Sequence, residues 1–265
     1  MLLLKDIRSA FDSYQQVVYP NGEKIIGITT AVPCVPQIIN GQDVAQISSI
    51  VTEMNLMTYD FHGTWEDQSG VNAPLFDEKS RNEYSVDGCV QRWIKEGADS
   101  DKINIGLPFY GRSFGGSTKL HSSHSGADDI HWWDDKGKPQ YYAILEKLQD
   151  MISIRDDATR TQFAYFDDEK GGLVSYDDNQ SICDKVDYAL SKNLNGYSIW
   201  DLTGDLTEDL ATPLLDIINI KLEKGDELDC SLFRAETRDR DGNVISQANT
   251  QEPDPWYGEL VCLTG

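Results

Sequence analysis

Three apolar runs of strand length in this sequence are each followed by aromatic and charged side chains. The side chains that follow the three runs are Met57, Tyr59 and Asp60, then Tyr110 and Arg112, then Trp200 and Asp201. Aromatic rings can stack on the apolar CH face of a sugar, while carboxylates and phenols can hydrogen-bond its hydroxyl and amide edges. The pattern therefore indicates a carbohydrate site, although rings near strand ends are as often part of a core.

The elements that must position these side chains follow from the periodicity of apolar residues. Strands are expected at Lys24–Val32, from Met54 onward, at Ile103–Tyr110 and at Gly196–Trp200. Helices are expected around 3–14, 47–54, 86–94, 182–190 and 212–220. Strands that alternate with helices imply a parallel sheet covered by helices. The predicted fold is therefore α/β: a partial (β/α)8 TIM barrel made of the last four strands, with a small α+β insertion.

The alternation is interrupted once, which sets the expected domain boundaries. Residues 1–114 and 177–224 are assigned to the partial barrel, and residues 115–176 to the α+β insertion. The insertion should hold a helix over Tyr142–Ile152 and strands near 163–166 and 173–176. Residues 225–265 read as a polar tail or linker, with a turn at 239–243 and a loop at 253–256. Four strands are half of an eight-stranded barrel, so we expect an N-terminal half barrel that is missing from this chain.

The charge of the chain restricts its ligands. The formal net charge is −22 and the sequence pI is about 4.4. Nucleic acids and anionic membrane surfaces are disfavoured because both require a basic protein surface. A neutral sugar polymer remains compatible, and solubility alone would also explain the acidity. Met1–Leu4 is followed at once by Lys5 and Asp6, so this start is not expected to be a signal peptide.

The five cysteines are widely spaced, with no C-x-x-C pair and no histidine at metal-ligand spacing. A zinc site is therefore not expected, and no metal or other cofactor is predicted. Cys89 and Cys183 fall on apolar helix faces and are expected to be buried thiols. Cys230 and Cys262 bracket the polar tail and could form a disulfide, which the odd total leaves open.

Several segments together resemble the family 18 chitinases over about residues 1–222. Met57–Glu66 with Asn72–Leu75 resembles the sixth-strand segment of that family, and Gly106–Phe114 resembles the seventh. Gly171–Asp178 and Gly196–Trp200 resemble the region of the eighth strand, and Thr30–Pro33 fits the end of the fifth. The segments follow the family's order and spacing, which is more specific than any one motif.

The resemblance implies an activity, a partner and a role for each site residue. Such enzymes cleave β-1,4-linked N-acetylglucosamine polymers by substrate-assisted retention, in which the acetamido oxygen of the sugar attacks the anomeric carbon. Chitin or chito-oligosaccharides are then the expected partners, and the extracellular space the expected location. The resemblance implies that Tyr59 and Asp60 orient the acetamido group and that Trp200 forms the floor under the sugar, with Met57 packed close by. It also implies sugar contacts at neighbouring positions for Tyr110 and Arg112, and stacking further along the cleft for Trp65.

The sequence departs from the family at the proton donor. In the family this residue is the glutamate of a D-x-x-D-x-D-x-E segment on the fourth strand, a pattern that this sequence does not contain. Asp167–Glu169 and Asp226–Glu227 lack its spacing, and Glu66 belongs to a loop motif with another role. Because general acid catalysis typically contributes ~10²–10⁴-fold in rate, the chain is expected to be inactive by itself.

Three interpretations follow. The first is the C-terminal half of a chitinase-like hydrolase whose acid-donor strand lies outside this chain. The second is a lectin-like relative that binds chitin oligomers without cutting them. The third is a chain that has no function alone, because half a barrel leaves strand edges unpaired and apolar faces open.

Overall fold

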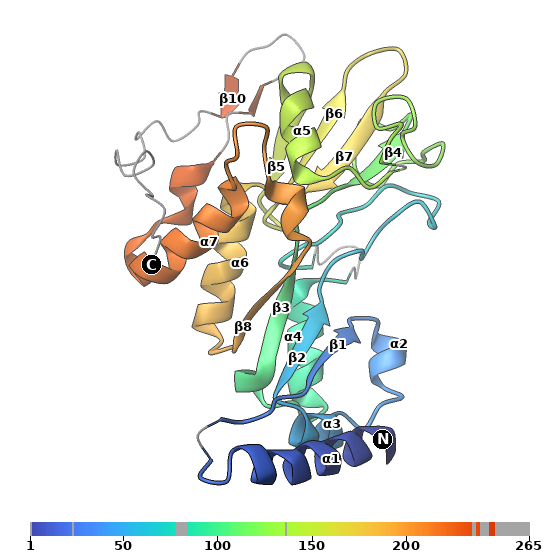
Figure 1. Cartoon of the computed structure of the whole chain (residues 1–265). Helices are drawn as coiled ribbons and strands as arrows, with labels where there is room; N and C mark the ends of the chain where they lie inside the picture. Colours follow the sequence, from blue (N-terminus) through green and yellow to red (C-terminus); the bar gives the residue numbers. More distant parts are fainter. Residues whose placement is uncertain are drawn as a thin grey trace.

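The structure is a computed structural model that describes residues 2–22, 24–77, 84–135 and 137–234, together with the backbone at 237–238 and 244–246. Two four-stranded sheets organise it, one parallel and one antiparallel. Figure 1 shows the antiparallel sheet beyond the C-terminal ends of the parallel strands, while α1 lies across the opposite end of the parallel sheet. The prediction of an α/β protein is confirmed.

The parallel sheet has the strand order β1-β2-β3-β8. Its strands are β1 (Thr29–Pro33), β2 (Glu53–Met57), β3 (Ile103–Pro108) and β8 (Gly196–Trp200). Every residue of β3 is buried, as expected for a central parallel strand that is covered on both faces. β1 and β8 are the outer strands among the described residues, and most of their side chains are partly or fully exposed.

The first strand is shorter and more exposed than predicted. A buried strand was expected over Lys24–Val32, but β1 begins at Thr29 and only Val32 in it is buried. The backbone at Ile26, before this strand, is held by side chains of α1. The Ile26 N–H donates to Gln15 Oε1 at 2.7 Å, and Arg8 Nη1 donates to the Ile26 carbonyl at 2.9 Å. Side-chain contacts of this kind cannot be inferred from a run of apolar residues.

Helices precede, separate and follow the parallel strands, as the periodicity predicted. They are α1 (Leu2–Val18), α2 (Pro36–Ile39), α3 (Val44–Ile50), α4 (Val86–Lys95), α6 (Asn179–Ser191) and α7 (Pro213–Lys224). The helix predicted over residues 47–54 ends earlier than expected. α3 stops at Ile50, and Met54 is a fully buried residue of β2.

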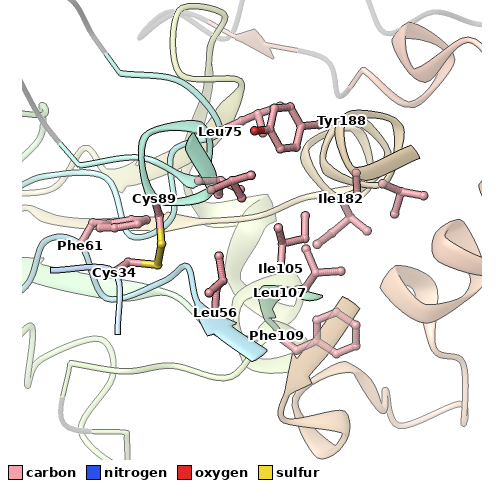
Figure 2. Close-up of a cluster of buried hydrophobic side chains, with 14 of the residues drawn as sticks. Cys34, Leu56, Phe61, Leu75, Cys89, Ile105, Leu107, Phe109, Ile182 and Tyr188 are labelled. Atoms are coloured by element: carbon pink, nitrogen blue, oxygen red, sulfur yellow. A yellow bond between two sulfur atoms is a disulfide. The ribbon is translucent and has the colours of Figure 1, made fainter. Parts of the chain in front are cut away.

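The main core lies between the parallel sheet and these helices (Figure 2). Leu56, Ile105 and Leu107 come from β2 and β3, and each is completely buried. Ile182 of α6 and Leu75 of the long loop before α4 are also completely buried. This packing fixes where the C-terminal ends of β2 and β3 lie.

The antiparallel sheet has the order β4-β7-β6-β5. It comprises β4 (Arg112–Gly115), β5 (Ile152–Asp156), β6 (Thr161–Phe166) and β7 (Gly172–Tyr176), with helix α5 (Tyr141–Lys147) beside it. The helix predicted over Tyr142–Ile152 is too long, because α5 ends at Lys147 and Ile152 begins β5. β4 starts three residues before the expected boundary at 115, so Arg112 is already part of this sheet.

Two disulfides correct the cysteine predictions. Cys34 bonds Cys89 with a Cα–Cα distance of 5.2 Å, and Cys183 bonds Cys230 with a Cα–Cα distance of 5.5 Å. The prediction of free thiols at Cys89 and Cys183 is therefore wrong, and so is a Cys230–Cys262 bond. Apolar helical spacing identified these cysteines as buried but could not show which distant cysteine packs against them.

The segment after α7 does not separate from the fold immediately. Short 3₁₀ turns at Gly225–Glu227 and Cys230–Phe233 keep Leu228 and Cys230 buried, and the second disulfide ties this segment to α6. A short strand pair follows, β9 (Thr237–Arg238) with β10 (Val244–Ser246). The turn expected at 239–243, the loop expected at 253–256 and Cys262 lie outside the described residues.

The first disulfide should stabilise the parallel sheet measurably. Replacing Cys34 and Cys89 together by alanine should lower the free energy of unfolding by about 2–4 kcal/mol, because the bond restricts the unfolded chain. Urea denaturation measures this change. The control is Leu210→Ala at a 78% exposed position, which should leave the midpoint nearly unchanged. A double variant as stable as the parent would contradict the assignment.

Asp205 should give the protein a measurable pH dependence. Its carboxylate accepts hydrogen bonds from the Leu214 and Leu215 N–H groups at the start of α7, and burial raises its pKa from 3.8 to about 6. Because the folded state holds this proton more tightly, the contribution of Asp205 to stability is present below pH 3.8 and is lost as the pH rises to about 6.

Asp205→Asn removes this titration. Relative to the parent, the variant should therefore gain unfolding free energy as the pH rises from 3.8 to about 6. Above that pH the difference should stay constant. Denaturation at a series of pH values measures the difference. A difference that is independent of pH would show that the raised pKa is wrong.

Candidate functional site

The candidate site lies where β2 and β3 end. Thr58 follows β2 directly and is completely buried. Its hydroxyl donates to the Gly106 carbonyl and accepts from the Gly106 N–H, both at 2.8 Å. Two bonds to one residue of β3 fix the end of β2, and with it the start of the segment that carries Tyr59 and Asp60.

Gly106 allows Tyr59 to lie directly on β3. A Cβ atom at position 106 would lie 2.7 Å from the Tyr59 ring and 2.7 Å from the Leu56 carbonyl oxygen, which is closer than real Cβ contacts. Tyr59 also meets Tyr110 edge to face, with ring centroids 6.1 Å apart and planes at 69°. The glycine of the seventh-strand motif therefore has a steric role in placing this ring.

Asp60 is the centre of the site. Its Oδ1 accepts from the Tyr110 hydroxyl at 2.6 Å and from Arg112 Nε at 2.8 Å, and its Oδ2 lies 2.7 Å from Arg112 Nη2. The guanidinium thus binds the carboxylate through two parallel contacts, the strongest geometry for this pair. The backbone of Asp60 has a left-handed φ of 59°, and its N–H donates to Asn72 Oδ1 at 3.1 Å.

Burial controls the protonation of the two phenols. It raises the pKa of Tyr110, and the negative charge and hydrogen bond of Asp60 raise it further, while Arg112 opposes the shift. Burial also raises the pKa of Tyr59, with a smaller contribution from the charge of Asp60. Both phenols therefore keep their protons at neutral pH; Tyr110 donates to Asp60, and Tyr59 is able to donate.

Trp65 lies against the guanidinium that binds Asp60. Arg112 Cζ is 5.0 Å from the centroid of the Trp65 ring, within the range of a cation–π contact. Gly63 packs under the ring, since a Cβ there would lie 2.2 Å from a ring atom. The ring nevertheless remains 58% exposed, so one face is open to a ligand. Its stacking on a sugar stays a prediction.

Trp200 reaches the same edge of the sheet from β8. It is opposite Pro108 in the pairing of β3 with β8, and its carbonyl accepts from the Phe109 N–H at 2.9 Å. Its peptide bond to Asp201 is cis, and its side chain is 53% exposed. Met57 is half-buried at the end of β2, opposite Pro33 of β1. Its packing against Trp200 stays a prediction.

The sequence did not identify Lys138, which the structure adds to this site. Lys138 Nζ lies 3.9 Å from the centroid of the Tyr110 ring and 5.8 Å from that of Trp200. Its backbone is paired with the strand that carries the site, because Ser113 and Gly111 donate to the carbonyls of the residues on either side of it. Partial burial lowers the pKa of Lys138, while Asp60 opposes the shift, Arg112 adds to it and Asp201 opposes it.

Some of the predicted site residues contact one another directly, and others are joined only through Lys138. Asp60, Tyr110 and Arg112 form one hydrogen-bonded unit with Tyr59 and Trp65 against it, and Lys138 links this unit to Trp200. Asn72 was missed as a positioning residue, although its segment was part of the family resemblance. Lys138 carried no signal, because it lies in an irregular segment of the insertion.

Glu66 and the possible metal ligands were the remaining candidates for chemistry. Glu66, considered as a substitute acid, accepts a hydrogen bond at its Oε2 from His62 Nδ1 at 2.6 Å. Among the described residues, no three His, Cys, Asp or Glu side chains gather as metal ligands would. Within the same ranges, no helix combines the length and apolarity that crossing a membrane requires.

The fold and site define a class of protein: an α/β protein with aromatic and charged groups at the C-terminal edge of a parallel sheet, the arrangement by which barrel enzymes present a site. The family model described as "Glycosyl hydrolases family 18" matches residues 1–205. The chain belongs to this family.

Individual relatives agree with that assignment. The chain is 30% identical to Endochitinase 1 of Metarhizium robertsii over 212 residues, which is 77% of this chain and 47% of the relative. A crystal structure of a chitinase from Trichuris suis has a TM-score of 0.75 and 26% identity, covering 83% of this chain and 64% of the other. A mutant class V chitinase from Nicotiana tobaccum in complex with NAG4 has a TM-score of 0.72 and 25% identity, covering 83% and 62%. The chain spans about half the length of the curated relatives it matches.

The Tyr110–Asp60 hydrogen bond should contribute to stability. Tyr110→Phe deletes a buried donor to a charged acceptor, so the free energy of unfolding should fall by about 1.5–3 kcal/mol at neutral pH. Chemical denaturation measures the loss. Tyr14→Phe, at a 60% exposed position, is the matched control and should change little. If the two variants were equally stable, Asp60 would not depend on this phenol.

Proposed function

We propose that this chain carries one wall of a glycoside hydrolase site for β-1,4-linked N-acetylglucosamine polymers. This wall consists of Tyr59, Asp60 and Trp200 and binds the acetamido group of the sugar. The observation that supports this most is Asp60, whose carboxylate is oriented by Tyr110 and Arg112 beside the neutral phenol of Tyr59. An acetamido group needs one acceptor for its N–H and one donor for its oxygen. A carboxylate next to a protonated phenol supplies both.

In the proposed reaction, Asp60 accepts the acetamido N–H and Tyr59 donates to the acetamido oxygen. That oxygen attacks the anomeric carbon while the bond from this carbon to the leaving oxygen breaks, and a water molecule then opens the cyclic intermediate with overall retention. Positive charge develops on the acetamido nitrogen as the ring closes, and the adjacent carboxylate stabilises it. Trp200 stacks below the reacting sugar, with its exposed ring as the floor.

The leaving oxygen also requires a proton. The D-x-x-D-x-D-x-E segment that carries the donor in this family does not occur in the sequence. We place the donor in the part of the relatives that this chain does not span, which is about half of their length. On this proposal the chain alone binds chito-oligosaccharides and does not hydrolyse them.

The disulfides support an extracellular setting for this function. Disulfides form and persist in oxidising compartments, and this chain has two among its described residues. A short oligomer presents the same linkage and acetamido groups as the polymer. The N-acetylglucosamine tetramer is therefore the appropriate soluble probe.

Calorimetry with the N-acetylglucosamine tetramer tests the proposal. The chain should bind this tetramer and should not measurably bind the glucose tetramer with the same linkage, which lacks acetamido groups. Trp200→Ala should weaken binding at least about tenfold, because stacking of a ring on a sugar is lost. Leu210→Ala, at a 78% exposed position outside the wall, is the control and should bind like the parent.

Two outcomes would contradict separate parts of the proposal. Equal affinity for the two tetramers would show that the wall does not recognise acetamido groups. Release of shorter oligomers by the chain alone, followed by chromatography, would show that the proton donor is already present. The expected result is selective binding with an unchanged tetramer.

A further inference from the structure

A cavity of about 470 Å³ lies between the inserted sheet, the start of α6 and the turn that follows α7. Three aromatic side chains line it: Tyr141 of α5, Tyr176 of β7 and Phe233. Aliphatic side chains complete its apolar wall: Leu145, Leu148 and Met151. This size and this mainly apolar lining are typical of small-molecule sites. The proposed sugar wall contributes no residue to this lining, as far as the structure describes the chain.

Asp178 is the single charged residue among the described residues that line the cavity. It is the N-cap of α6, and its Oδ1 accepts from the Ser181 N–H at 2.8 Å and from the Ser181 hydroxyl at 2.7 Å. The same oxygen lies 3.4 Å from Arg155 Nη1. Its Oδ2 has no hydrogen-bond partner within the described part of the chain. One oxygen of this buried carboxylate is therefore satisfied, and the other is left without a donor.

The Arg155 guanidinium offsets the charge of Asp178 only in part. Three carboxylates share it, because its Nη2 is also 2.6 Å from Asp184 Oδ2 and its Nε is 3.8 Å from Asp157 Oδ1. Arg155 is not one of the described residues that line the cavity. The lining therefore contains an acidic residue and, within the described ranges, no basic one.

The two phenols of the lining report the electrostatic potential in the cavity. Burial raises the pKa of Tyr141, and the charges of Asp178 and Asp205 raise it further. Burial also raises the pKa of Tyr176, and the charge of Asp178 adds to this shift, while side-chain hydrogen bonds oppose it. Both rings therefore lie in a negative potential, which favours a cation in the cavity that they line.

We propose that this cavity binds a small organic ammonium ion with an apolar body, of the arylalkyl amine class. The apolar body packs against the aliphatic wall, and the ammonium group lies near Asp178 among the aromatic side chains. A cation within about 6 Å of an aromatic ring is attracted by the ring, which adds to the attraction of the carboxylate. The inference is independent of the proposed function, because the cavity and the sugar wall are lined by different residues.

Three probes with the same ring and different charge test the site: phenethylammonium, phenethyl alcohol and phenylacetate. NMR titration of the full chain at about pH 7, where an aliphatic amine keeps its proton, measures their affinities. The ammonium ion should bind at least about tenfold more tightly than the alcohol, and the alcohol more tightly than the carboxylate, because a nearby unit charge at an effective dielectric constant near 20 changes an affinity by that factor or more. Shift changes at the backbone amides of Leu145, Met151 and Phe233 locate the bound probe.

Two variants remove the preference for the cation in different ways. Asp178→Asn keeps a side chain that can cap α6 and removes the charge, so the ratio of the ammonium affinity to the alcohol affinity should fall at least about tenfold. Met151→Lys leaves Asp178 and its partners in place and adds an ammonium group to the cavity wall, so it should also abolish the preference. The second variant provides the test if the first does not fold. Asp150→Asn removes a negative charge from an exposed neighbouring position outside the lining and is the matched control, with an unchanged ratio.

Several results would overturn the site. Equal affinities of the parent for the ammonium ion and the alcohol would show that Asp178 does not select a cation, and no binding of any probe would show that the cavity takes no such ligand. An effect of Asp150→Asn as large as that of the lining variants would reduce the preference to general surface charge. Displacement of the ammonium ion by the N-acetylglucosamine tetramer would place it at the sugar wall instead.

Discussion

The hydrogen-bonded contact of Asp60 with Arg112 and Tyr110 is the interaction on which the site depends. It joins the end of one strand to the residues that follow the next, so it exists only if β2 and β3 are parallel neighbours in register. Arg112 satisfies both carboxylate oxygens, which reduces the cost of holding a charge in a half-buried position. The same contacts orient the carboxylate, so one interaction sets both the stability and the direction of the acidic group.

The antiparallel sheet supports this contact from the other side. Arg112 is the first residue of β4 and pairs with Ser175 of β7. The Ser175 hydroxyl accepts from the buried Asn72 N–H at 3.0 Å, and Asn72 in turn accepts from the Asp60 N–H. Asn72 also donates to the Tyr110 carbonyl at 3.2 Å. The inserted sheet therefore holds the guanidinium and, through Asn72, the left-handed backbone of Asp60.

Two disulfides tie distant segments of the fold together, and two partly exposed strands form the edges of its parallel sheet. The Cys34–Cys89 bond ties the segment after β1 to α4, and the Cys183–Cys230 bond ties α6 to the segment after α7. The outer strands β1 and β8 are partly exposed, unlike the completely buried β3. Parallel sheets are normally buried on both faces, so the exposure of these strands agrees with a chain that spans about half of its relatives.

The sequence by itself determined the alternation of strands and helices, because apolar periodicity records which face of each element is buried. It also placed Tyr59, Asp60, Tyr110, Arg112 and Trp200 near strand ends, since each lies at the end of an apolar run or within a few residues after it. Only the tertiary structure decided what lies far apart in sequence and close in space. The pairing of the cysteines, the role of Asn72 and the position of Lys138 all depend on packing between distant segments, which no local pattern encodes.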